Sequence, residues 1–253
     1  MDKDFTLSVY NDLCISLLKN NFRTVKVVDY LEKKISGPKK YAIMRHDVDR
    51  LPLQALKMAK IEHSLGIQST YYFRSIKSVF KKELITSIYD LGHEIGYHYE
   101  VLAKNNGNKE KAIEEFKKTL ENFRNIVDIK TICMHGSPLS SWRDSDLWQD
   151  LNYNDYDIMG EAFLSIDYNS VMYFTDTGRK WKNDSSNIRD TVISNIVPLN
   201  VTSTKDLILK LPKIKTDISI NTHPHRWHES FLGWQWEFIS QNIKNFGKYL
   251  ISK

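Results

Sequence analysis

Predicted strands and helices alternate along most of this chain, and this alternation is the feature that most constrains its fold. Short apolar or aromatic runs predict strands, and apolar residues at helical spacing predict the helices between them. The predicted strands are residues 41–45, 69–73, 94–99, 130–134, 171–175 and 217–221. The predicted helices are residues 5–20, 28–34, 53–65, 82–91, 109–125, 142–151, 204–211 and 234–249. Such an order predicts βα units and a parallel sheet or barrel.

The length and the even composition predict a single domain. The chain has 253 residues, of which 41% are hydrophobic, and it contains no internal repeat, low-complexity tract or Pro/Gly-rich linker. An α/β barrel commonly occupies ~250 residues as one unit. We therefore expect one catalytic domain over residues 1–253, with residues 1–40 as an N-terminal helical extension packed on it.

Charge and cysteine content narrow the function classes. The formal net charge of +5 comes from 36 basic and 31 acidic residues, and no arginine-rich or basic-aromatic run indicates nucleic-acid binding. The two cysteines form no CxxC motif, which is typical of a reducing compartment. We see neither a signal-peptide pattern nor ~18 consecutive apolar residues. The expectation is a cytoplasmic protein without a membrane span, whose mildly positive surface would favour an anionic substrate.

The segment Arg45-His46-Asp47-Val48-Asp49 follows an apolar run and reads as a buried strand that ends in polar residues. Residues two apart in a strand share a face, so Asp47 and Asp49 are expected to point the same way and His46 the other. Two like charges side by side are unfavourable unless a cation or a proton separates their roles. The alternative is that Asp is simply common where strands give way to turns.

Further metal-ligand residue types follow other predicted strands. His98, His135 and His223 lie at or just past predicted strand ends, as Asp47 and Asp49 do. In βα folds the site collects at the C-terminal ends of the strands. Together with the Asp-x-Asp pair, His98 is a candidate ligand for a divalent metal, and Glu100 would share its face in an extended segment. His93 is expected to be structural, and His63 and His228 are expected at the surface.

Aromatic residues beside charged ones predict a sugar-binding surface. Exposed aromatics next to Asp and Arg suit sugars through stacking and hydrogen bonds. The candidate substrate-binding residues are Asp176, Arg179, Trp181, Arg226 and Trp227. The alternative is that Trp181 packs in the core after a strand and turn. Trp234 and Trp236 are expected to anchor the last helix.

Three segments together resemble the polysaccharide deacetylases (carbohydrate esterase family 4, the NodB homology domain). His46-Asp47-Val48-Asp49 resembles their first motif as a divergent branch of it, and residues 92–98, Gly-His-Glu-Ile-Gly-Tyr-His, resemble their second. Residues 218–223 are similar to the late strand that ends in histidine. The resemblance runs from about residue 41 to residue 225 and is specific only in combination.

The resemblance implies a distorted (β/α) barrel of about seven parallel strands that binds one Zn²⁺, or another divalent ion such as Co²⁺, Ni²⁺ or Mn²⁺. It implies removal of N-acetyl groups from amino sugars. By position, Asp47 would be the general base, Asp49 and His98 metal ligands, and His223 the general acid. Leu102 stands where the family has a further histidine ligand, so either Glu100 or His135 supplies the third ligand, or the metal site is weak or absent.

A second departure concerns the arginine that orients the base in this family. The family's Arg-Pro-Pro-x-Gly motif is absent, and the corresponding strand end reads His135-Gly136-Ser137-Pro138. Either Arg45 or Arg179 takes that role, or the orienting arginine is missing.

These observations predict a metal-dependent N-deacetylase. Its substrate would be a nucleotide-linked, lipid-linked or oligosaccharide amino-sugar precursor, with surface polysaccharide synthesis as a natural setting. One alternative is a C–N hydrolase of a non-sugar amide on the same fold. Another is a catalytically silent carbohydrate-binding protein, which Leu102 and the missing arginine motif favour.

Overall fold

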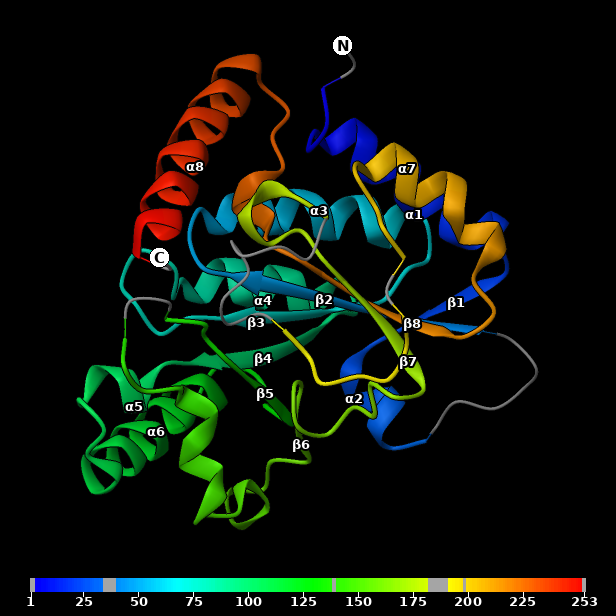
Figure 1. The fold of residues 1–253 in the computed structure, drawn as a ribbon. Helices are drawn as coiled ribbons and strands as arrows, with labels where there is room; N and C mark the ends of the chain where they lie inside the picture. The colour runs from blue at the N-terminus through cyan, green and yellow to red at the C-terminus, as the bar shows by residue number, and fades with distance from the viewer. Residues whose placement is uncertain (1–2, 34–39, 138–139, 182–190, 198, 252–253) are drawn as a thin grey trace.

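The structure is a computed structural model that describes residues 3–33, 40–137, 140–181, 191–197 and 199–251 (Figure 1). A curled parallel sheet with flanking helices forms a distorted (β/α) barrel, as predicted. Its strand order is β6-β5-β4-β3-β2-β8-β7, and β1 pairs with the first half of β2. The strands are β1 (Phe22–Val25), β2 (Lys40–Val48), β3 (Thr70–Phe73), β4 (Glu94–Tyr99), β5 (Thr131–Met134), β6 (Gly160–Glu161), β7 (Val171–Thr175) and β8 (Asp217–Thr222).

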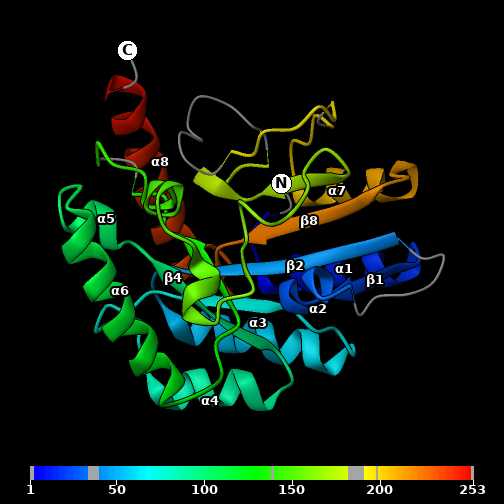
Figure 2. The same cartoon turned by 90° about the horizontal axis from the view of Figure 1, so that it is seen from below.

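Helices cover the outside of the curled sheet, whose curvature is visible in Figure 2. The α-helices are α1 (Leu7–Lys19), α2 (Val27–Leu31), α3 (Pro52–Ser64), α4 (Lys82–Asp90), α5 (Val101–Lys104), α6 (Lys109–Arg124), α7 (Thr204–Lys210) and α8 (Phe231–Ile251). Short 3₁₀ helices are η1 (Asp144–Gln149), η2 (Tyr153–Tyr156), η3 (Thr177–Arg179), η4 (Leu211–Lys213) and η5 (Pro224–Arg226).

Strand β2 runs through the middle of the sheet and is buried on both faces. Ala42 and Met44 pack with the outer helices, in one apolar cluster with residues of α1 and α3. Ile43 packs toward the barrel interior with Tyr72 and Tyr173. Burial on both faces gives an apolar run instead of a polar–apolar alternation. Successive side chains continue to point to opposite faces of the sheet at the polar end of the strand.

Most predicted elements are present, and the differences are local. Strands β1 and β6 and helix α5 were not predicted, because each has five residues or fewer and gives little periodicity. The helix predicted over residues 142–151 is the 3₁₀ helix η1. Residue 34, the end of the predicted second helix, lies outside the described residues. The region 1–40, expected as a helical extension, also contributes strand β1 to the sheet.

Candidate metal centre

Three side chains from different strand ends converge at one end of the barrel. Asp49 follows β2, His98 lies in β4 and His135 follows β5. Asp49 Oδ1 lies 3.4 Å from His98 Nε2 and 3.5 Å from His135 Nε2. One ligand atom from each of the three lies within 4.8 Å of the others. His98 is buried, whereas Asp49 and His135 are partly exposed, so the group can be reached from solvent.

Hydrogen bonds fix which nitrogen of each imidazole faces this centre. His98 Nδ1 lies 2.9 Å from the carbonyl oxygen of Cys133 and donates to it. His135 Nδ1 lies 3.1 Å from Ser137 Oγ and 3.2 Å from Glu100 Oε2. A ring that donates through Nδ1 keeps the Nε2 lone pair free, and this is the arrangement that metal-binding histidines use. Both Nε2 atoms point at Asp49.

The spacing of these atoms fits a tetrahedral cation better than hydrogen bonds. Nitrogen–oxygen hydrogen bonds measure 2.7–3.2 Å, less than the 3.4 and 3.5 Å found here. Ligands that lie ~2.0–2.2 Å from a tetrahedral ion are about 3.3–3.5 Å apart. Among the described residues, buried Asp49 Oδ1 has no hydrogen-bond partner of acceptable geometry. Asp49, His98 and His135 therefore fit as ligands of Zn²⁺ or a similar divalent ion.

Charges around the centre keep its carboxylates ionised. Burial by itself raises the pKa of Asp49, but the adjacent His98 ring and the positive fields of His135 and His223 bring it well below its usual range. Burial lowers the pKa of His98, yet Asp47 and Asp49 raise it overall. Two carboxylates beside these rings make the centre attractive to a cation.

Neither Glu100 nor Leu102 lies at the position of a third metal ligand. Glu100 lies behind His135, at its Nδ1 side, and also accepts a hydrogen bond of 2.6 Å from Arg74 Nη2. Of the two expected third ligands, His135 belongs to the metal-ligand group with Asp49 and His98, and Glu100 does not. Leu102 is buried in the core, and Asp144 accepts hydrogen bonds from its backbone N–H.

Asp47 lies beside the centre in a two-point ion pair. Arg45 Nε and Nη2 donate to its two oxygens at 3.2 and 3.0 Å, and Asn221 Nδ2 donates to Oδ2 at 2.9 Å. Burial raises the pKa of Asp47, but Arg45, His98 and His223 lower it to about 2. Of the two arginines expected to orient this carboxylate, Arg45 contacts it. Arg179 instead stacks on Trp234, 4.6 Å from the ring centre.

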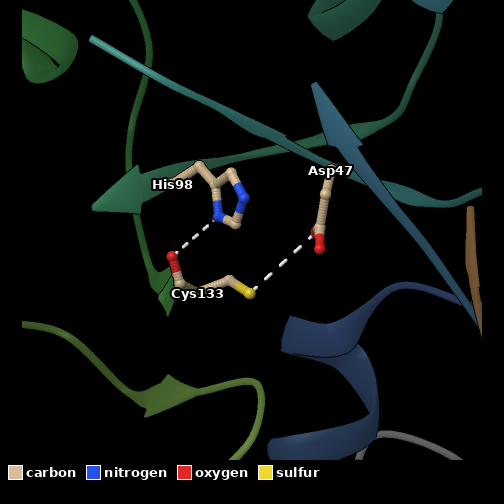
Figure 3. A group of neighbouring side chains, drawn as sticks. All are labelled: Asp47, His98 and Cys133. Carbon is tan, nitrogen blue, oxygen red and sulfur yellow. Dashed lines mark hydrogen bonds between the residues drawn. The ribbon is translucent and has the colours of Figure 1, made fainter. Parts of the chain in front are cut away.

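A second group of metal-ligand types, Asp47, His98 and Cys133, lies deeper in the barrel (Figure 3). Cys133 Sγ is 3.9 Å from Asp47 Oδ1, and all three residues are buried. The guanidinium of Arg45 already neutralises Asp47, and it would repel a cation at that position. The partly exposed group around Asp49 is therefore the better candidate metal centre.

His223 approaches the centre from β8. Its Nε2 lies 3.9 Å from Asp49 Oδ2, and its Nδ1 lies 2.6 Å from Asp176 Oδ1. Asp176 is fully buried and also accepts hydrogen bonds from Trp227 Nε1 at 2.8 Å and Arg226 Nη1 at 2.6 Å. Burial raises the pKa of Asp176, but Arg226 and His223 lower it overall. The ionised carboxylate therefore orients His223 with Nε2 toward the centre.

The expectation of exposed aromatics for sugar stacking is wrong. Trp227 is completely buried, and Trp181 is 5% exposed, with its Nε1 donating to Thr204. Their N–H groups find partners inside, so both rings pack in the core. Asp176 and Arg226 are likewise buried, on the far side of His223 from the centre. His228, expected at the surface, is buried too and contacts the carbonyl oxygen of His225.

A different charged cluster lies on the opposite face of β2. Glu62 of α3 is fully buried and accepts hydrogen bonds from Tyr10, Ser69 (2.5 Å) and Tyr71 (2.6 Å). His46 Nε2 lies 2.8 Å from its Oε1. Burial raises the pKa of Glu62, but His46, His93 and Ser69 lower it to about 2. No sequence pattern reveals this cluster, because its members come from five separate segments.

Comparisons with known proteins identify no family for this chain. No family model matches it, and neither does any curated protein. Among solved structures, it is similar to a family 4 carbohydrate esterase from Bacillus anthracis, with 15% identity over 94% of this chain and 86% of that one and a TM-score of 0.44. A Streptococcus mutans CE4 esterase has 13% identity over 72% of this chain and 86% of that one, with a TM-score of 0.41.

The chain is also similar to a CE4 family pseudoenzyme from Bacillus anthracis, with 13% identity over 73% of this chain and 69% of that one and a TM-score of 0.43. Similarity at this level identifies no activity, so the functional argument rests on the site's own residues. In the described part of the chain, every helix is too short or too polar to cross a membrane.

Proposed function

We propose that this protein is a metal-dependent hydrolase that removes an N-acetyl group from an amino sugar. The observation that carries the proposal is the separation of Asp49 Oδ1 from His98 Nε2 and His135 Nε2, 3.4 and 3.5 Å, which suits a shared tetrahedral ion. Zn²⁺ is the first choice for one carboxylate and two imidazoles, and Co²⁺, Ni²⁺ and Mn²⁺ are the others. When bound, the ion would supply a Lewis acid that acidifies water and polarises a carbonyl oxygen.

Asp47 is the proposed general base. Its two bonds to Arg45 hold the carboxylate in one orientation, and its lowered pKa keeps it ionised at neutral pH. An ionised carboxylate beside the ligand set can accept a proton from the attacking water without itself holding the metal. Such a proton transfer is worth roughly 10²–10⁴-fold in rate.

His223 is the proposed general acid. Asp176 holds its Nδ1, so Nε2 is the nitrogen that can deliver a proton at the centre. The departing amine needs that proton, because an amide nitrogen leaves poorly as an anion. Asp176, Arg226 and Trp227 then act by positioning His223 instead of touching the sugar.

The sugar class is supported by the resemblance of residues 46–49 and 92–98 to deacetylase motifs. The proposed substrate is a nucleotide-linked, lipid-linked or oligosaccharide precursor that carries an N-acetylated amino sugar, as in surface polysaccharide synthesis. The mildly positive net charge of +5 suits a phosphorylated or otherwise anionic precursor.

The test is acetate release by Zn²⁺-loaded protein from a nucleotide-linked N-acetylhexosamine and from N-acetylated oligosaccharides, with His98→Ala as the matched control. We expect release by the wild type and none by the variant. Turnover of a non-sugar amide without acetate release would instead indicate another C–N hydrolase. Glycan binding by protein that takes up no metal would indicate a silent carbohydrate-binding protein, and either result would overturn the proposal.

A further inference from the structure

Helix α8 turns its apolar residues away from the rest of the molecule. It stands at the edge of the barrel in both views (Figures 1 and 2). Five of the large apolar side chains that it exposes form one stripe, Leu232 (77%), Trp236 (75%), Ile239 (54%), Ile243 (67%) and Phe246 (64%), whereas Phe231 (50%) and Phe238 (46%) lie outside this stripe. Trp236, expected from the sequence to anchor this helix, is thus on its outer side. A monomer rarely leaves so large a contiguous apolar surface uncovered.

Polar contacts hold the inner side of α8 against the body. Glu237 is 2% exposed and accepts a hydrogen bond of 2.9 Å from Arg50, and Gln241 is 5% exposed. Asn245 Nδ2 donates to the carbonyl oxygen of Gly178 at 2.9 Å. Arg179 Nη1 donates to the carbonyl oxygen of Trp234 at 3.1 Å. These contacts fix the rotation of the helix, so its apolar side is directed outward by specific interactions.

The five residues of the stripe repeat with the spacing of a helix–helix seam. Leu232, Trp236, Ile239, Ile243 and Phe246 are separated by intervals of four, three, four and three residues. Their mean spacing is that of the heptad repeat, which keeps one narrow stripe facing a partner helix. On the same wheel, Glu237 and Gln241 fall on the side away from the stripe, which is the side packed on the body.

The residues that flank the stripe allow the α8 helix of a second copy to pack against it. Gln235, Ser240 and Asn242 lie at the flanking positions and are uncharged, so two copies would meet without like-charge repulsion. A helix that lies on a membrane surface is typically rich in Lys or Arg across its polar face. Among the described residues of α8, that face carries Glu237 and Gln241, both buried against the body, and a single exposed lysine, Lys244.

We propose that the protein forms a two-fold symmetric dimer in which the α8 helices of two copies pack along this stripe. A two-fold interface uses the same patch on both partners, so one self-complementary stripe suffices. The two aromatic members alone, each worth ~150–250 Å² when fully covered, make it a substantial apolar surface. This dimer does not depend on the proposed activity.

Dimerisation would also stabilise one wall of the metal centre. Glu237 bonds Arg50, which is the neighbour of Asp49 in the chain, and it lies 3.9 Å from His225. His225 in turn lies two residues beyond His223. A helix held by a partner copy would therefore hold the segments that carry one ligand and the proposed acid.

The test is the mass of the full chain in solution, measured by sedimentation at ~10–100 µM for three proteins. We expect twice the chain mass for the wild type and a single chain mass for the double variant Ile239→Glu/Ile243→Glu. The matched control is Leu209→Glu on α7, whose side chain is 73% exposed outside the stripe, and it should remain a dimer. Circular dichroism spectra should be similar for all three, since the changed side chains are exposed.

Two results would overturn the dimer. One is a single chain mass for the wild type over the whole concentration range. The other is an identical mass for the wild type and the double variant. If monomeric wild type bound vesicles of anionic phospholipid and the double variant did not, α8 would be a membrane-surface helix and the dimer proposal would be wrong.

Discussion

Two clusters of carboxylate and imidazole lie on opposite faces of strand β2, and they differ in how fully the carboxylate is bonded. Glu62, on the outer face, is completely buried, and its contacts with Ser69, Tyr71 and His46 measure 2.5–2.8 Å. Asp49, at the barrel end, is partly exposed, and its nearest imidazole nitrogens lie at 3.4 and 3.5 Å.

The difference separates a structural cluster from the candidate metal centre. Glu62 has its negative charge compensated by donors at hydrogen-bond distance, so nothing further is needed there. The imidazole nitrogens of His98 and His135 lie too far from Asp49 Oδ1 for hydrogen bonds, at a separation that suits ligands of one shared ion. The same residue types therefore suit stability on one face of the strand and, in the proposed function, cation binding at its end.

The largest expected effect is loss of the metal when a ligand is removed. His98→Ala and His135→Ala should each reduce bound Zn²⁺ from about one per chain to a small fraction, because two remaining ligands hold zinc poorly. Elemental analysis after dialysis measures this directly. His63→Ala, an exposed histidine on α3, is the control and should keep its metal. Full zinc content in either ligand variant would refute the assignment.

The next effect concerns turnover without loss of metal. Asp47→Asn should retain Zn²⁺ and lower the turnover number by ~10²–10⁴-fold, since the amide cannot accept the proton. The amide oxygen still offers Arg45 an acceptor, so the fold should survive, which circular dichroism checks. An unchanged turnover number would show that Asp47 is not the base.

A change in the cluster around Glu62 should alter the stability of the fold and leave the metal content unchanged. Glu62→Gln leaves buried His46 without its charged partner and should lower the free energy of unfolding by about 3–5 kcal/mol. Urea denaturation measures the loss, and Glu121→Gln, at an exposed position of α6, is the control. Loss of zinc at full stability would reverse the roles given to the two clusters.

The acid dependence of stability sharpens the same distinction. The pKa of Glu62 is about 2 in the folded protein against a usual 4.5, so the unfolded chain binds its proton more readily. The stability from this group is present above pH ~4.5 and is lost as the pH falls toward 2, on the order of 3 kcal/mol in all. The stability gap between wild type and Glu62→Gln should therefore narrow below pH 4.5. A gap independent of pH would contradict this account.

The smallest expected effect comes from the group behind His135. Glu100→Gln weakens the hold on His135 Nδ1 and should reduce zinc affinity by ~10–100-fold while leaving the stoichiometry near one at saturating metal. Competition with a chromophoric chelator measures the change. An effect as large as that of His135→Ala would indicate that Glu100 is itself a ligand.

The barrel and the convergence of its strand ends could be predicted from the sequence. Burial of β2 on both faces leaves an apolar run, residues 41–44, that leads into Arg45, His46 and Asp47, and parallel strands bring their C-terminal ends to one edge. The choice between Glu100 and His135 could not be made, because β4 ends at Tyr99 and α5 begins two residues later. That abrupt turn places Glu100 beside Arg74 and His135, and no sequence pattern reports its direction.

The aromatic residues show a second feature that could not be predicted from the sequence, namely which of their side chains are buried. Apolar and aromatic spacing is the same whether a side chain packs in the core or against a partner. Trp181 and Trp227, expected at a sugar-binding surface, are buried, whereas Trp236, expected as an anchor, is exposed. Only tertiary contacts, such as that of Trp227 Nε1 with Asp176, decide which face is covered.

Anomalous diffraction from zinc-loaded crystals tests the central claim most directly. We expect one peak, ~2.0–2.2 Å from Asp49 Oδ1, His98 Nε2 and His135 Nε2, with Asp47 close by but not coordinating. A peak coordinated by Cys133 and Asp47, or no ordered ion near these strand ends, would contradict the account.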